Sequence, residues 1–208
     1  MWAKSAFGIC KTNTGAVDEE YRTLEDISES FYKRHMFNCI RDGKYQSFYP
    51  VKITEYFKDN PPEDIEQFLS FRHIEITCRG TLEIRSDCTQ PLYDAFAPPA
   101  FNLGIAHNIE RAISITNELL KDSNLTNSYL RRCVSEGCGI SEISKEQLSE
   151  YALCMVHIAE EGLIKRGLGE EVLLKCLYKR AETLKCPEMY TLKNKDTIED
   201  VIKKYSKL

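Results

Sequence analysis

Charged and apolar residues alternate along the run FRHIEITCRGTLEIRS, positions 71–86, and these charged side chains are the clearest candidates for chemistry. Residues two positions apart in a β-strand share a face. Two strands that meet at the central Cys-Arg-Gly would therefore place Glu75, Glu83 and Arg85 on one side, and the isoleucines and leucine between them on the other. The alternation predicts a short antiparallel pair of strands with one polar face.

Two carboxylates on neighbouring strands lie about 5 Å apart, where they repel by roughly 3 kcal/mol at an effective dielectric near 20. A cation relieves this repulsion, and either Arg85 or a magnesium ion would serve. Magnesium prefers oxygen ligands and commonly uses one or two carboxylates together with substrate phosphates. An arginine can also hold a phosphate oxygen in fork geometry. The competing interpretation is a solvated face of a half-exposed antiparallel sheet, which produces the same alternation.

The surrounding sequence predicts the elements that would position this polar face. Two β-prone runs flank Asp42-Gly43, a pair typical of a tight hairpin turn. Helical spacing of apolar residues predicts a surface helix within 16–35, and short helices are expected from Thr54 and over 63–70. Beyond the proline-rich break at 96–101 the pattern is helical to a charged, frayed tail. Cys186-Pro187 is expected to end the last helix.

These patterns predict an α+β fold, with an antiparallel sheet covered on its apolar face by helices. The chain is expected to be one domain, 1–208, in which 1–100 is mostly sheet and hairpin and 101–208 is helical. A chain of 208 residues, 42% of them hydrophobic, is long enough to bury one sizeable core.

Composition excludes several classes of function. A formal net charge of -4 provides no basic field to hold a nucleic acid backbone. The sequence has no apolar run long enough to span a membrane and no secretion signal, and its nine cysteines are odd in number and scattered. We therefore expect a cytoplasmic protein with reduced thiols. Cys133, Cys138, Cys154 and His157 are too widely spaced to favour a structural zinc site.

The run RGTLEIRS at 79–86 resembles the central motif of the glutamate-cysteine ligase family, in which an Arg-Gly-x-Leu-Glu-x-Arg strand precedes an acidic turn, a proline and an apolar helix. The run SDCTQPLYDAFAPPAFNLGI, 86–105, follows the same layout. HMFNCIRDGKY, 35–45, is similar to the family's strand, glycine turn and Lys-Tyr. The segment 148–187 looks like its last helices.

The resemblance implies an enzyme that uses ATP and magnesium to join the γ-carboxylate of glutamate to the amine of cysteine, the first step of glutathione biosynthesis. By resemblance, Glu83 coordinates magnesium and Arg85 contacts the transferred phosphate. Arg79 matches a basic position just before the motif glycine, and Glu75 is a further candidate for the metal or for a supporting role. Thr77 stands where related sequences carry an additional arginine.

The family fold implied is a glutamine-synthetase-like antiparallel cup, and family members are longer than this chain. The segment at Trp2 corresponds to their middle, so we expect this chain to carry the C-terminal half of a site that an N-terminal half or a second copy completes. The alternative is a catalytically incomplete nucleotide- or metal-binding module, or a helical interaction module, derived from that family.

Overall fold

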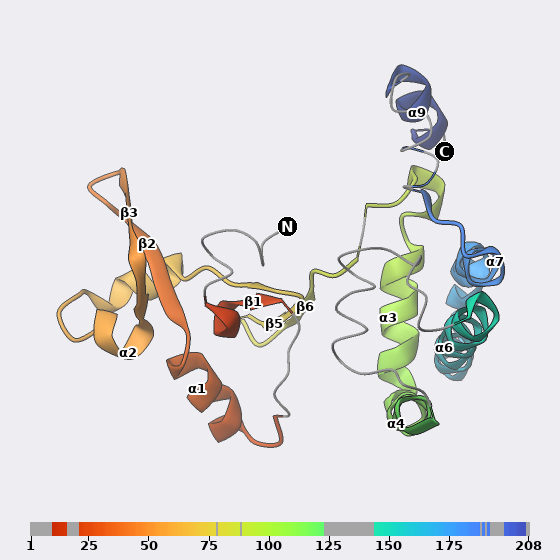
Figure 1. Cartoon of the computed structure of the whole chain (residues 1–208), viewed down its shortest axis with the longest axis horizontal. Coiled ribbons are helices and arrows are strands. Elements are labelled where there is room, and N and C mark those ends of the chain that lie inside the picture. Colours follow the sequence, from red (N-terminus) through yellow and green to blue (C-terminus); the bar gives the residue numbers. More distant parts are fainter. Residues whose placement is uncertain are drawn as a thin grey trace. The chain divides into compact units, whose positions relative to one another are not determined.

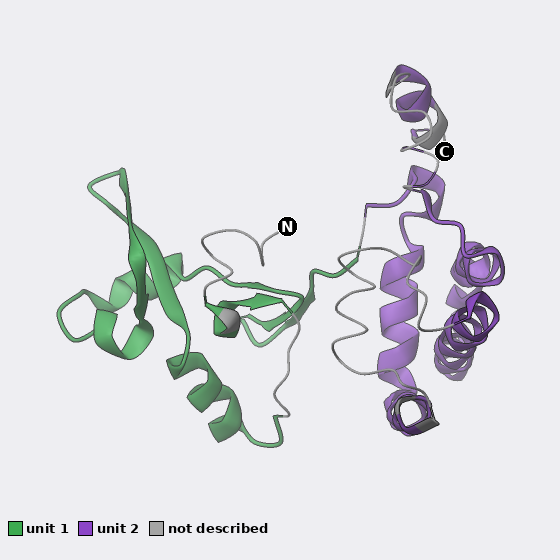
Figure 2. Cartoon of the chain, viewed as in Figure 1, with its two compact units in different colours: residues 1–87 green, residues 88–208 purple. Residues whose placement is uncertain are grey.

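The computed structural model describes residues 10–15, 21–77, 79–87, 89–122, 144–187, 189, 191 and 198–206. The chain divides into two compact units, residues 1–87 and 88–208, coloured separately in Figure 2. The fold is mixed α and β and mostly helical. Its described strands pair into three two-stranded sheets, with orders β1-β4, β2-β3 and β5-β6.

The first unit contains all of the described strands, with short helices between them (Figure 1). In chain order its elements are η3 (Lys11–Asn13), β1 (Thr14–Gly15), α1 (Leu24–Tyr32), β2 (His35–Arg41), β3 (Lys44–Lys52), α2 (Ile53–Tyr56), η4 (Pro62–Gln67), β4 (Phe71–Arg72), β5 (Ile74–Ile76) and β6 (Leu82–Ile84), where η denotes a 3-10 helix.

The described elements of the second unit are all helical, as the sequence predicts for this part of the chain. They are η5 (Leu92–Asp94), α3 (Ala97–His107), α4 (Ile109–Asp122), α6 (Lys145–Arg166), η6 (Glu170–Leu174), α7 (Lys175–Thr183) and α9 (Ile198–Tyr205). The expectation of a frayed tail is wrong for 198–205, which is helical and buries Val201. No helix in the described ranges combines the length and the apolar character needed to cross a membrane.

The hairpin predicted at Asp42-Gly43 is confirmed. Strands β2 and β3 are antiparallel, with Arg41 opposite Lys44. Asp42 (φ 52°) and Gly43 (φ 70°) both adopt the left-handed conformation that a two-residue hairpin turn requires. Buried Met36 on β2 packs with residues of α2 to form the core of this unit, and Figure 1 shows α2 beside the hairpin.

Local capping explains where α1 begins. The side chain of Thr23 accepts a hydrogen bond from the backbone N–H of Asp26, and the Asp26 carboxylate accepts one from the N–H of Thr23. This reciprocal pair satisfies two donors that a helix N-terminus leaves free. The predicted helix is present but begins at Leu24, and residues 16–20 of the predicted range lie outside the described residues.

Two predicted short helices differ in detail. Helix α2 begins at Ile53 after Lys52, which makes no side-chain cap, so Thr54 lies inside the helix and does not cap it. The helix predicted over 63–70 is the 3-10 helix η4, which starts after Pro61 and ends at Gln67. Pro61 and Pro62 fix the backbone at its start, where their missing N–H groups cost no helical hydrogen bond.

Small residues bring α3 and α6 together in the second unit. A Cβ atom on Gly104 would lie 2.2 Å from the backbone O of Ala159, and one on Gly162 would lie 2.0 Å from the backbone O of Gly104. The two backbones therefore touch where larger side chains would hold them apart. Around this contact, Ala100, Val156, Ala159, Leu163 and Leu174 form the buried core.

Candidate functional site

The β5–β6 hairpin places the two candidate carboxylates opposite each other. Its strands are antiparallel, and Glu75 is the cross-strand partner of Glu83. The turn closes through a hydrogen bond from the N–H of Gly80 to the carbonyl of Thr77, and Gly80 has a left-handed φ of 74°. The prediction that Glu75 and Glu83 are neighbours across two antiparallel strands is confirmed.

The backbone of His73 ties this hairpin to the rest of the first unit. The His73 N–H donates to the carbonyl of Gly15 at 2.8 Å, and its carbonyl accepts from the N–H of Arg85 at 2.7 Å. Strand β4 pairs in parallel with β1 just before this point. Hydrogen bonds on both sides therefore hold the chain from Phe71 to Ile76, which carries Glu75.

Glu75 forms a buried ion pair with Arg34. The Arg34 Nη1 atom lies 2.6 Å from the Glu75 Oε2 atom, and both side chains are more than nine-tenths buried. The guanidinium also lies over the rings of Phe31 and Phe68, 5.7 and 5.8 Å from their centroids, where the ring electrons favour a cation. Arg34 thus supplies the positive charge that offsets the repulsion between Glu75 and Glu83.

Glu83 is the accessible carboxylate of the facing pair. Its Oε2 atom accepts a hydrogen bond from Arg85 Nη2 at 2.7 Å, and 47% of its side chain is exposed. This hydrogen bond lowers the pKa of Glu83 and raises that of Arg85, so both groups are charged at neutral pH. Arg85 also donates through Nη1 to the carbonyl of Ser70, which holds its guanidinium in place.

Arg79 lies at the exposed turn of the hairpin, where its backbone N–H donates to the hydroxyl of Thr77. The structure therefore places Arg79 at the turn and brings Glu75, Glu83 and Arg85 together. Thr77 and Thr81 join their hydroxyl groups at 2.7 Å across the base of this turn.

The two faces of the hairpin are not buried as expected. Ile74, Ile76 and Leu82 were expected to be the covered side, but they are 40%, 39% and 61% exposed. Glu75, expected on the open side, is 8% exposed because Arg34 neutralises its charge inside the unit. Alternation in the sequence predicts which residues share a face, but it does not predict which face is buried.

An apolar cavity of about 180 Å³ adjoins the ion pair. Its lining combines Arg34 and Glu75 with Tyr21, which precedes α1, with Ile27 and Phe31 of α1, with Arg72 of β4, and with Ile74, Ile76 and Leu82 of the hairpin. The exposed apolar side of β5 and β6 therefore borders this cavity.

Within the described ranges, no three His, Cys, Asp or Glu side chains come together to hold a metal ion. Of the residues considered for zinc, Cys133 and Cys138 lie outside the described residues. His157 contacts Glu160, Glu161 and the hydroxyl of Tyr178. A magnesium ion at the hairpin would have the carboxylate of Glu83 as its accessible ligand, which suits an ion that keeps waters and binds phosphates.

Sequence reasoning missed Arg34 as part of this site. It is 41 positions away from Glu75 and follows a surface helix, so no local pattern links the two residues. The one available signal is physical: a buried carboxylate requires a partner. That signal appears only once the burial of Glu75 is known.

The comparisons with known proteins provide no related site with which to compare this geometry. No protein-family model matches the chain, and a search of curated proteins finds no match.

Proposed function

We propose that this chain is the C-terminal part of an ATP- and magnesium-dependent ligase of the glutamate-cysteine ligase type. It would help to join the γ-carboxylate of glutamate to the amine of cysteine, the first step of glutathione biosynthesis. The observation that carries the proposal is the Glu83–Arg85 pair on a hairpin whose sequence resembles the motif of that family.

The residues present suit the two cofactors. Glu83 is exposed and ionised, and it offers the hard oxygen that magnesium prefers. Arg85 is fixed by Ser70 and Glu83 and retains further N–H donors for a phosphate oxygen. When bound, magnesium would neutralise charge on the phosphates of ATP. Arg79 would add a positive charge at the turn.

Glu75 has a supporting role in this proposal. Its carboxylate is bonded to Arg34 inside the unit, so it is less available to magnesium than that of Glu83. We propose that Glu75 holds β5 in place opposite Glu83 and adds to the negative electrostatic potential around Arg85. The hydrogen bond to Glu83 is the main cause that raises the pKa of Arg85, and the charge of Glu75 adds to this effect.

The half-exposed apolar side of the hairpin supports a partner that completes the site. An N-terminal half or a second copy could cover Ile74, Ile76 and Leu82 and extend the two-stranded ladder into a glutamine-synthetase-like cup. Both strands are short, and a two-stranded hairpin gains stability from a further strand or a covering layer. ATP, glutamate and cysteine would then bind inside the completed cup.

The pairing of Glu75 with Arg34 also favours a second function, binding of magnesium-ATP without formation of product. With Glu75 engaged, Glu83 is the accessible carboxylate of the facing pair. A chain of this kind would bind the nucleotide but lack carboxylates that a ligase needs to complete its metal site.

One experiment tests the binding that both functions share. Magnesium-ATP should raise the melting temperature of the purified chain, because a ligand that binds only the folded state stabilises it. Glu83→Gln should abolish the part of this shift that depends on magnesium. Glu66→Gln, an exposed residue of the same unit, serves as the matched control and should retain it. An equal shift in Glu83→Gln and the unchanged chain would contradict the proposal.

A second measurement separates the two functions. The chain is incubated with ATP, magnesium, glutamate and cysteine, and γ-glutamylcysteine is sought by mass spectrometry. Product that disappears in Glu83→Gln supports the ligase. A melting shift without product supports the binding module.

A further inference from the structure

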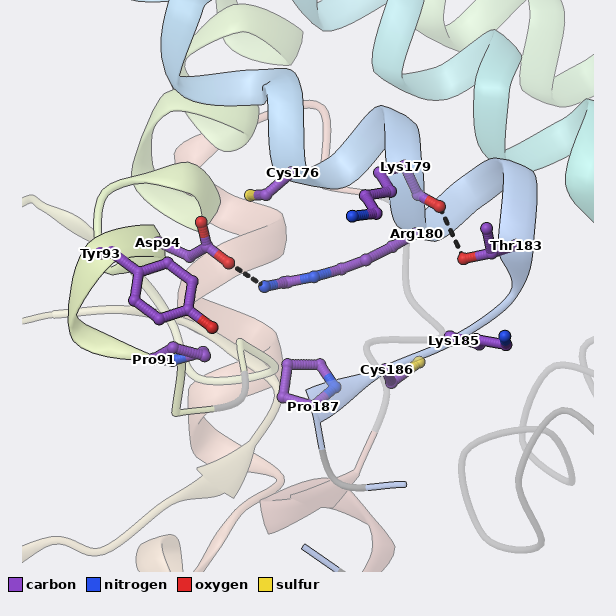
Figure 3. A pocket seen from close by; sticks show the side chains of 10 residues that line it. All are labelled: Pro91, Tyr93, Asp94, Cys176, Lys179, Arg180, Thr183, Lys185, Cys186 and Pro187. Atoms are coloured by element: carbon purple, nitrogen blue, oxygen red, sulfur yellow. Dashed lines mark hydrogen bonds and ion pairs between the residues drawn. The ribbon is translucent and has the colours of Figure 1, made fainter. Parts of the chain in front are cut away.

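The second unit contains a cavity of about 480 Å³ that the proposed ligase chemistry does not use. It lies between η5 and α7, with the segment that follows α7 along one side (Figure 3). Its lining includes Pro91, Tyr93, Lys179, Arg180, Lys185 and Pro187. A cavity of this volume is within the usual range for small-molecule sites.

The cavity is positively charged in a protein whose net charge is negative. Among the described residues, three cationic side chains line it against the single carboxylate of Asp94. Arg180 is held by this carboxylate, with Nη2 2.5 Å from Asp94 Oδ2, and by the side chain of Gln90. Both members of the ion pair are more than four-fifths buried. Arg180 thus has its charge balanced and forms a fixed part of the wall.

Lys179 and Lys185 supply the positive charge of the cavity that Asp94 does not balance. Both are exposed, and neither pairs with a carboxylate of the part of the chain that the structure describes. In Figure 3 Lys179 projects from α7 and Lys185 from the segment that follows it, on either side of the Arg180 side chain. An anion with two negative charges would balance both lysines.

The opposite side of the cavity is flat and apolar. Figure 3 shows the ring of Tyr93 beside the rings of Pro91 and Pro187. Tyr93 is 54% exposed. Exposed aromatic rings stack on flat groups such as nucleobases.

We propose that this cavity binds a small organic phosphate, a phosphomonoester joined to a flat apolar group such as a nucleobase. A phosphomonoester carries a charge of about -1.5 to -2 near neutral pH, which matches two lysines. The phosphate lies against Lys179 and Lys185, and the flat group lies against Tyr93 and the two prolines. This binding requires no magnesium and does not rest on the proposed ligase function.

The test is calorimetric titration of the full chain with adenosine monophosphate in the presence of a metal chelator. We expect Lys179→Gln with Lys185→Gln to weaken binding by about tenfold or more, as loss of two charge-assisted contacts implies. Lys175→Gln, on the same helix but outside the cavity, is the matched control and should bind as the unchanged chain does. Circular dichroism confirms that each variant is folded.

Two further probes test the apolar side. Tyr93→Ala should weaken the binding of adenosine monophosphate but leave that of inorganic phosphate unchanged. The unchanged chain should bind inorganic phosphate more weakly than adenosine monophosphate. Equal affinity for the two, or equal affinity of the double lysine variant and the unchanged chain, would overturn the inference, as would the absence of binding.

Thiol labelling locates the bound molecule. Cys176 and Cys186 line the cavity, whereas Cys154 on α6 does not. Adenosine monophosphate should slow alkylation of the first two thiols and leave Cys154 unaffected. Glu83→Gln should bind adenosine monophosphate normally, because Glu83 belongs to the other unit. Binding lost in Glu83→Gln with the cavity thiols unprotected would place the nucleotide at the hairpin and refute a site in this cavity.

Discussion

At the scale of single residues, the facing carboxylates of the hairpin have unequal environments. Glu75 is buried against Arg34, whereas Glu83 is half exposed beside Arg85. A buried charge depends on its partner, because neither member can return to water without unfolding. An exposed pair remains solvated when one member is removed. The two carboxylates should therefore respond differently to the same substitution.

We predict that Glu75→Gln lowers the free energy of unfolding by about 3 to 5 kcal/mol, since it leaves the guanidinium of Arg34 buried without a countercharge. Glu83→Gln should have a much smaller effect. Urea denaturation followed by circular dichroism measures both. Adding Arg34→Met to Glu75→Gln should restore part of the loss, because an apolar side chain replaces the unpaired charge. A Glu75→Gln variant as stable as the unchanged chain would show that the ion pair does not hold β5.

Asp64 gives the first unit a dependence on pH. Its Oδ2 atom accepts hydrogen bonds from Tyr56 and from Arg41, each at 2.5 Å, and its side chain is buried. The hydrogen bond from Tyr56, followed by that from Arg41, lowers the pKa of Asp64. A carboxyl group with a depressed pKa stabilises the fold above its unfolded pKa of about 3.9, and this stabilisation is lost as pH falls through the folded value.

Asp64→Asn should therefore be less stable than the unchanged chain near neutral pH, and the difference should shrink as pH falls below about 4. Urea denaturation at a series of pH values measures this difference. Asp59→Asn, an exposed residue nearby, is the control and should follow the unchanged chain at every pH. A difference that is constant across the acid range would mean that ionisation of Asp64 does not contribute.

At the scale of elements, the helices α3 and α6 of the second unit are in backbone contact. Gly104 and Gly162 allow their backbones to touch, and no flexible side chain stands between them. Gly→Ala in a helix normally gains about 1 kcal/mol. Here the new methyl group would meet backbone atoms that cannot turn aside, so the helices would have to separate.

Gly104→Ala and Gly162→Ala should each lower the free energy of unfolding of the second unit by about 2 kcal/mol or more, because the cost of overpacking exceeds the gain in helix propensity. Glu150→Ala, on an exposed position of α6, should be nearly neutral. Thermal unfolding of the three variants compares them. A stabilised Gly104→Ala would mean that α3 and α6 are not in backbone contact.

Local elements were predictable from the sequence, whereas their burial was not. Asp42-Gly43 specifies a turn because of the backbone conformations that these two residues favour. Glu75 and Glu83 face each other because a short turn joins two strands whose side chains alternate between the two faces. The partner of Glu75 is Arg34, which lies between α1 and β2, and no local pattern encodes its contact with β5. The cavity beside α7 likewise joins residues from 91 to 187, which sequence spacing does not relate.

At the scale of the whole molecule, the two units have separate hydrophobic cores. Met36, Ile53 and Tyr56 form the buried centre of the first unit. Leu163 and Leu174, with the small residues of α3 and α6, form that of the second. The hairpin with Glu83 belongs to the first unit and the cationic cavity to the second. Damage to one core should therefore leave the chemistry of the other unit in place.

Met36→Ala and Leu163→Ala test this separation. Each removes a fully buried side chain and should cost about 2 to 5 kcal/mol within its own unit. Hydrogen exchange followed by mass spectrometry should show faster exchange over 21–77 and 79–87 in Met36→Ala, and over 97–122 and 144–183 in Leu163→Ala, with the described residues of the other unit unchanged. Met36→Ala should accordingly lose the magnesium-dependent response to ATP and retain the binding of adenosine monophosphate, and Leu163→Ala should do the reverse. Faster exchange throughout the chain in either variant would mean that the units unfold as one, since separate cores transmit no loss of packing to each other.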